Sequence, residues 1–221
     1  MRVADILEHP RRPGRYLLTL SDERSFTLSA SLLADIGATR KGVELNAVAI
    51  DKLALESEVL RTMDRAIASL SRGRRTRRDL EQRLRRVKPG FVAPDVAIVA
   101  TALDQLTDSG VLSDAAVARA EASSRLRRGD APRRVEMLLQ RKGIERGVAA
   151  DAVLTAVREE EVDVDALCVE VARKRFRTLG KLEPKVARRR LIGFLMRRGY
   201  GSGSIRLALA ELSVPEHFGA R

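Results

Sequence analysis

"LLQRKGIERGVAADAVLTAV" (residues 138–157) and "FLMRRGYGSGSIRLALAEL" (residues 194–212) follow one pattern at two places in the chain. In each stretch an apolar pair is followed by basic residues, a Gly and an apolar residue, and then by a second apolar helical pattern. A Gly directly after a helix is typical of the left-handed residue that ends it. The two stretches therefore predict helices that end at Gly143 and Gly199, each followed by another helix.

Apolar pairs at i, i+4 spacing extend this pattern to a third copy, because residues four apart share one helix face. The pairs are Leu80 and Leu84, Val135 and Leu139, and Leu191 and Leu195. Their second members are 55 and 56 residues apart, at positions 84, 139 and 195. Self-similarity at such a period is typical of tandem supersecondary units. In the first copy the helix stop is expected at Lys88, with Pro89 and Gly90 following it.

Each copy reads as helix–helix–helix, because further apolar helical patterns precede and follow the three middle helices. Pro132 and Pro184 each suit the first turn of a middle helix. Three residues separate Pro132 from Val135 but seven separate Pro184 from Leu191, so the third middle helix is expected to be one turn longer. The predicted three-helix units are residues 57–108, 112–158 and 162–213.

Residues 1–52 differ from the rest of the chain. "GRYLLTL" (14–20) and "RSFTLSA" (24–30) flank the polar "SDE", which predicts a β-hairpin. A short helix ending near Gly37 is expected to follow. The fold class is therefore mainly α, with a small N-terminal β-hairpin module in residues 1–52.

Composition limits the kind of core and the kind of chemistry. Apolar residues make up 44% of the 221-residue chain, aromatic residues only 3%, and Trp is absent, which predicts an aliphatic core. The one cysteine, Cys168, lies at helical spacing with apolar neighbours, so we expect an inert buried thiol. No long apolar run suggests a membrane span or a signal peptide, so the cytoplasm is expected.

Positive charge is concentrated in three basic segments, residues 71–88, 123–142 and 173–198. They hold 9, 7 and 11 Lys or Arg against 2, 2 and 1 Asp or Glu. Their net charge of +22 within a chain of +12 leaves −10 for the remaining residues. Such a distribution favours binding to a polyanion or to an acidic protein surface over a uniformly basic, solvated exterior.

Helical wheels place many of these cations opposite the predicted core. Leu191 and Leu195 face inward on the last middle helix, and Val135 and Leu139 do so on the second. Outward positions are predicted for Lys185, Arg188, Arg189, Arg190 and Arg197, and for Arg133, Arg134 and Arg141. Duplex DNA would bind such surfaces through its phosphates. No residue stands out as a base reader, and few aromatics are available to stack on bases.

The combined pattern resembles the RecX family of bacterial regulators of the RecA recombinase. The matching stretches are "SRGRRTRRDLEQRL" (71–84), "LDQLTDSGVLSD" (103–114), "SRLRRGDAPRRVEMLLQRKGI" (124–144) and "RKRFRTLGKLEPKVARRRLIGFLMRRGY" (173–200). The resemblance implies three tandem three-helix units in an elongated, curved body that lodges in the groove of the RecA–DNA filament. There the family inhibits RecA's recombinase, ATPase and coprotease activities.

The same resemblance points to basic residues that would contact RecA or DNA. They are Arg74, Arg75, Arg77, Arg78, Arg125, Arg127, Arg128, Arg133, Arg134, Lys174, Arg175, Arg188, Arg189, Arg197 and Arg198. A monomer without catalytic residues, metal or cofactor is expected, with the RecA filament and non-specifically bound DNA as partners. A general duplex-DNA-binding protein of the nucleoid type is the alternative.

Overall fold

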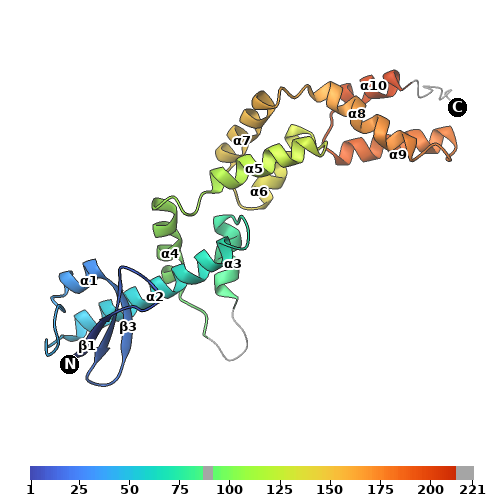
Figure 1. The fold of residues 1–221 in the computed structure, drawn as a ribbon. Helices are drawn as coiled ribbons and strands as arrows, with labels where there is room; N and C mark the ends of the chain where they lie inside the picture. The colour runs from blue at the N-terminus through green and yellow to red at the C-terminus, as the bar shows by residue number, and fades with distance from the viewer. Residues whose placement is uncertain (87–91, 213–221) are drawn as a thin grey trace. The chain divides into compact units, whose positions relative to one another are not determined.

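The computed structural model describes residues 1–86 and 92–212 of the chain (Figure 1). The chain forms two compact units, Met1–Leu112 and Ser113–Arg221, and each buries its own apolar residues. Helices dominate both units, and the only described strands lie near the N-terminus. The expected mainly helical class with a small N-terminal β module is thereby confirmed. No helix in the described ranges is long and apolar enough to cross a membrane.

The N-terminal module is a three-stranded antiparallel sheet rather than a two-stranded hairpin. Its strands, in the order β1–β2–β3, are Val3–Glu8, Arg15–Leu20 and Ser25–Ser29. β2 and β3 form the predicted hairpin, whereas β1 was not predicted. A register shift between Val3 and Asp5 interrupts the alternation of inward and outward side chains in β1, which hides it from a period-two pattern.

A short helix follows the sheet, as the sequence predicted. α1 (Ala30–Asp35) is capped by the Ser29 side chain, which accepts a hydrogen bond from the Leu32 backbone N–H. Gly37 has φ of +67°, the left-handed conformation that glycine adopts readily after a helix.

α2 (Ala47–Leu70) joins the sheet to the first group of helices as one continuous element. Leu53 is buried with the sheet, whereas Ala66 is buried with the helices that follow. The predicted boundary between residues 52 and 57 therefore lies inside this helix. No Gly or Pro occurs between residues 47 and 70, so nothing in the sequence breaks the helix there.

The first predicted middle helix is α3 (Arg77–Arg85), which packs with α2 and α4 (Val96–Asp108). Its apolar pair is buried: Leu80 has 0% of its surface exposed and Leu84 3%. The expected helix stop at Lys88, Pro89 and Gly90 lies outside the described residues.

The Ser113–Arg221 unit contains two successive groups of three helices. α5, α6 and α7 share one apolar core and α8, α9 and α10 share another. Their bounds are α5 Asp114–Arg127, α6 Pro132–Arg141, α7 Arg146–Glu159, α8 Val164–Arg177, α9 Pro184–Arg197 and α10 Ser202–Glu211.

The two repeated stretches, residues 138–157 and 194–212, contain the predicted helix ends in this unit. Gly143 and Gly199 have φ of +85° and +86°, as expected for glycines that end helices. Pro132 and Pro184 are the first residues of α6 and α9. α9 has 14 residues and α6 has 10, which confirms the extra turn in the third middle helix.

Candidate functional site

The first basic segment surrounds the start of α3. Arg74 and Arg78 are exposed, in line with a binding role. Arg75 lies 3.5 Å from Asp79, and Arg77 lies 2.8 Å from Asp104. The side chain of Thr76 caps the helix by accepting a hydrogen bond from the Asp79 backbone N–H.

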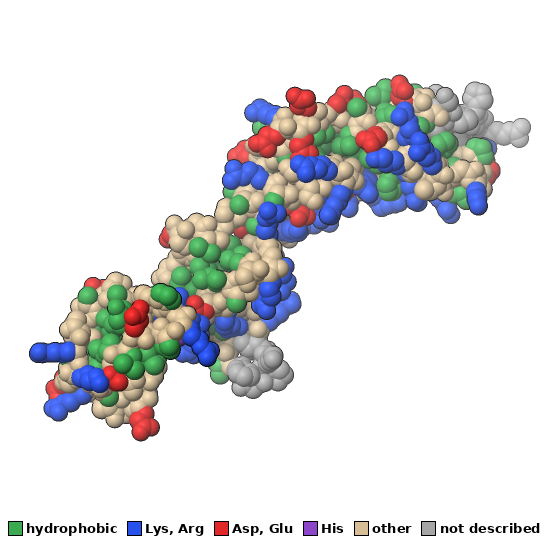
Figure 2. All heavy atoms as spheres, in the orientation of Figure 1, with side chains coloured by type: hydrophobic (Ala, Val, Ile, Leu, Met, Phe, Trp, Pro, Cys, Tyr) green, Lys and Arg blue, Asp and Glu red, His purple; other side chains and the backbone are tan. Residues whose placement is uncertain are grey.

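Within the Ser113–Arg221 unit, Lys and Arg side chains gather along one side (Figure 2). Exposed Lys and Arg residues of this unit include Arg127, Arg128 and Arg133 of the second segment and Lys174, Arg189 and Arg197 of the third. Two of them have carboxylate neighbours, since Arg127 lies 3.0 Å from Glu160 and Lys174 lies 2.5 Å from Glu170.

Three of the predicted binding arginines instead converge on one buried carboxylate. The Asp130 side chain is only 8% exposed, and its oxygens lie 3.3 Å from Arg125, 3.3 Å from Arg134 and 3.4 Å from Arg198. A carboxylate accepts hydrogen bonds from several guanidinium groups at once and balances their charge. We call Asp130, Arg125, Arg134 and Arg198 the Asp130 cluster. Three of the fifteen predicted binding residues are therefore engaged in a contact within the protein.

The helical wheel predicted an outward position for Arg134, but it could not show that this residue contacts a neighbouring helix group. Arg134 points away from the core of its own helix but lies against the turn between α9 and α10. Its guanidinium donates to the Arg197 carbonyl oxygen, and a Cβ atom on Gly199 would come within 2.5 Å of the Arg134 Cβ. Arg134 is thus half-buried between the two helix groups of this unit rather than solvated.

Backbone and aromatic contacts surround the Asp130 cluster. The Arg198 carbonyl accepts a hydrogen bond of 2.9 Å from the Ala131 N–H, and Ala131 is buried with the apolar core of α8, α9 and α10. The Tyr200 hydroxyl donates a buried hydrogen bond of 3.1 Å to the Gly129 carbonyl. Burial raises the pKa of Tyr200, so this hydroxyl stays protonated and can donate. Together these contacts fasten the α5–α6 loop to the α9–α10 turn.

A hollow of about 320 Å³ lies beside the Asp130 cluster, between the C-terminal end of α5 and the helices α8 and α9. Its basic lining residues are Arg127, Arg128, Lys174, Arg175 and Arg198. Glu170 is the one acid among the described lining residues, and a hydrogen bond from Lys174 lowers its pKa. Phe194 lies on its wall, with the guanidinium carbons of Arg175 and Arg198 each 5.3 Å from the ring centre.

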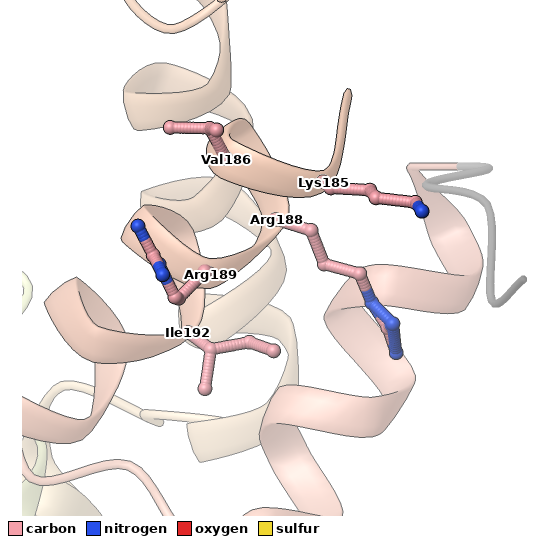
Figure 3. Close-up of a pocket in the computed structure, with 5 residues that line it drawn as sticks. All are labelled: Lys185, Val186, Arg188, Arg189 and Ile192. Atoms are coloured by element: carbon pink, nitrogen blue, oxygen red, sulfur yellow. The ribbon is translucent and has the colours of Figure 1, made fainter. Parts of the chain in front are cut away.

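A second hollow lies along the N-terminal half of α9 (Figure 3). Lys185, Val186, Arg188, Arg189 and Ile192 line it, and the Arg188 and Arg189 side chains point to different sides of the helix (Figure 3). Arg189 is exposed, as the wheel predicted. Arg188 is only half-exposed, and its Nε is inaccessible to water. The expected outward position of Arg188 therefore needs correction, because its side chain lines this hollow and is only partly exposed to solvent.

Metal-ligating groups and the single thiol were the candidates for reactive chemistry in the described part of the chain. No group of three or more His, Cys, Asp or Glu side chains there could hold a metal ion. Cys168 is fully buried, and desolvation raises the pKa of its thiol to about 11, so the reactive thiolate is scarce near neutral pH. The prominent feature on the surface of the Ser113–Arg221 unit is its accumulation of guanidinium groups.

Comparisons with known proteins connect these features to one family. Residues 161–209 match the family model described as RecX, third three-helix domain. The regulatory protein RecX of Halorhodospira halophila is 34% identical over 157 residues, which cover 70% of this chain and 88% of that protein. That of Amycolatopsis mediterranei is 38% identical over 130 residues, covering 58% and 70%.

Two solved structures share the fold. A crystal structure of regulatory protein RecX aligns with a TM-score of 0.75 at 21% identity, covering 95% of this chain and 98% of the other. RecX from Lactobacillus salivarius aligns with a TM-score of 0.56 at 18% identity, covering 72% and 98%. The structures support the fold, and the identity to curated relatives over most of their length decides the family. This chain belongs to the RecX family.

Proposed function

We propose that this protein regulates the RecA recombinase by binding the RecA–DNA filament and inhibiting its recombinase, ATPase and coprotease activities. The observation that carries the proposal is the recurrence of a basic segment in each group of three helices, together with membership in a family of regulatory proteins. A filament repeats its subunits along DNA, so a chain with repeated cationic segments can contact more than one subunit or more than one phosphate. The filament groove, as expected from the family, would accommodate such contacts.

Linked contacts give affinity without one strong site, because each additional contact forms at a high effective concentration once the first is made. Exposed basic residues outside the Asp130 cluster are available for this role. They include Arg74, Arg78, Arg128, Arg133, Arg189 and Arg197. A monomer bound at a growing end would block addition of further RecA subunits, so inhibition is expected at low ratios of regulator to RecA.

Truncation tests the contribution of linked contacts. A chain ending at Glu160 lacks the residues that match the third three-helix domain of the family and lacks the whole third basic segment. We expect this chain to inhibit RecA far more weakly than the intact protein. Circular dichroism provides the control for folding, and full inhibition by the shortened chain would contradict the argument from linked contacts.

A general duplex-DNA-binding protein is the second candidate, because the same cations would neutralise phosphates on naked DNA. Co-sedimentation separates the two functions. The regulator is expected to sediment with RecA filaments at moderate salt and to bind naked duplex less tightly. Equal or tighter binding to naked DNA, without an effect on RecA, would favour the second candidate.

A further inference from the structure

The basic hollow beside the Asp130 cluster has more cations than its own acids can balance. Five Lys or Arg side chains and one Glu are among its described lining residues, an excess of four positive charges. Like charges so close together repel one another unless an anion is present. The hollow is partly open to solvent, so an external anion can reach it.

Partners inside the protein account for three of the five cations. Arg127 pairs with Glu160, and Lys174 pairs with Glu170. Arg198 contacts Asp130 and donates to the Arg128 carbonyl oxygen at 2.5 Å. Arg128 and Arg175 have no carboxylate partner among the described residues. The Nε of Arg175 is inaccessible to water and lacks a hydrogen-bond partner in that part of the chain, although buried donors are normally satisfied.

Phe194 influences what kind of anion group can bind. The guanidinium groups of Arg175 and Arg198 both lie over its ring, which favours them through cation–π attraction and limits their motion. A stacked guanidinium still presents its N–H edge to an oxygen anion. The covered ring is not free to stack on a base. The hollow therefore suits the sugar–phosphate backbone of a nucleic acid better than its bases.

Stabilisation of helix C-termini is an alternative role for the same cations. Arg127 and Arg128 end α5, and Lys174 and Arg175 lie in the last turn of α8, where cations complement the helix dipole. However, three of the carbonyls at these helix ends already accept hydrogen bonds from other side chains. Arg128 accepts from Arg198, Gly129 accepts from Tyr200, and Arg175 accepts from the Thr178 hydroxyl. Helix capping therefore does not engage the guanidinium N–H groups of Arg128 and Arg175.

We propose that this hollow binds phosphodiester groups of the DNA backbone, with Arg128 and Arg175 as the main donors. The charge excess favours DNA over an acidic protein, because duplex DNA carries about one negative charge per 1.7 Å of its axis. This proposal deepens the proposed function by assigning a DNA contact, yet it does not depend on RecA. Binding at the hollow is expected to be independent of base sequence.

The test measures anisotropy of a fluorescein-labelled duplex of mixed sequence over a series of salt concentrations. The variant R128A/R175A removes both donors from the full chain. Loss of two phosphate contacts makes the slope of log K against log salt less negative by about 1.8. For a variant and a wild-type protein that bind equally at 1 M salt, this difference in slope makes the variant bind roughly 60-fold more weakly than the wild type at 0.1 M salt.

Two further variants separate a defined site from bulk charge. R146A/R158A removes the same charge from exposed positions of α7, outside the hollow, and should leave most of the affinity intact. R128K/R175K keeps both charges and should retain the wild-type slope while binding less tightly, because Lys lacks the guanidinium fork. Thermal unfolding of every variant identifies any loss of fold.

Several outcomes would overturn the proposal. One is wild-type DNA binding by R128A/R175A, whether or not its thermal stability falls. Another is an equal loss for R146A/R158A. A third is a variant R128A/R175A that still binds DNA normally but no longer binds RecA in the absence of DNA. That result would mean that the hollow binds carboxylates of RecA. If R128A/R175A loses DNA binding as expected while the wild-type protein leaves RecA unaffected, the hollow is supported and only the proposed regulation fails.

Discussion

Replacement of Asp130 by Asn is the sharpest test of the contact between the two helix groups of the Ser113–Arg221 unit. Asn has nearly the same size as Asp but no charge, so the change removes the electrostatic centre of the Asp130 cluster without creating a cavity. Three guanidinium groups at 3.3, 3.3 and 3.4 Å would then face one another without a counter-charge.

The expected cost follows from burial. Removing one partner from a fully buried ion pair costs roughly 3–5 kcal/mol. Here the carboxylate is 8% exposed, but the three arginines are 26–34% exposed and can regain water. The Asn oxygen can also still accept a hydrogen bond. We therefore expect Asp130→Asn to lower the free energy of unfolding by about 2–3 kcal/mol.

Thermal unfolding measures this loss. For a unit of this size, about 4 °C of melting temperature corresponds to each kcal/mol, so the transition should fall by about 8–12 °C. Glu170→Gln is the matched control, because its pair with Lys174 is 56–71% exposed and should contribute less than about 1 kcal/mol. If Asp130→Asn melts no lower than this control, the Asp130 cluster does not fasten the two helix groups and the burial argument is refuted.

Three further predictions concern the helix end, the exposed cations and the thiol. Gly143→Val should cost about 1–2 kcal/mol in unfolding free energy, because a β-branched residue is strained at φ of +85°; an unchanged urea midpoint would contradict this. The triple change of Arg189, Arg190 and Arg197 to Ala should make the salt slope of DNA binding less negative with little change in melting temperature, since all three are exposed; an unchanged slope would mean that these residues contact no DNA. Cys168 should resist thiol reagents at pH 8 in the folded protein and react after denaturation, because a pKa of about 11 leaves about 0.1% thiolate; rapid labelling of the folded chain would refute its burial.

Much of the helical fold could be predicted from local chemistry. The glycines at 143 and 199, the prolines at 132 and 184 and the buried i, i+4 pairs all act within one or two helical turns, so their effects are visible in the sequence. Strand β1 could not be recognised in this way. Its place depends on pairing with β2 across a register shift, which no local periodicity records.

The candidate site was harder to predict than the fold. A helical wheel shows which side chains avoid the core of their own group, but it cannot show what a neighbouring group covers. Arg134 and Arg198 are 64 positions apart in the chain, yet both contact Asp130. The signal available in the sequence was the lone Asp within a strongly basic stretch, between Gly129 and Ala131. An isolated acid among many cations is a candidate centre for ion pairs.

The most direct test of the central proposal measures RecA's DNA-dependent ATP hydrolysis while the purified full-length protein is added. Because linked basic segments would let one molecule contact several positions on the filament, we predict strong inhibition at well below one molecule per RecA subunit. Undiminished ATP hydrolysis at equimolar protein, together with tight binding to naked duplex DNA, would contradict regulation of RecA and favour a general DNA-binding role.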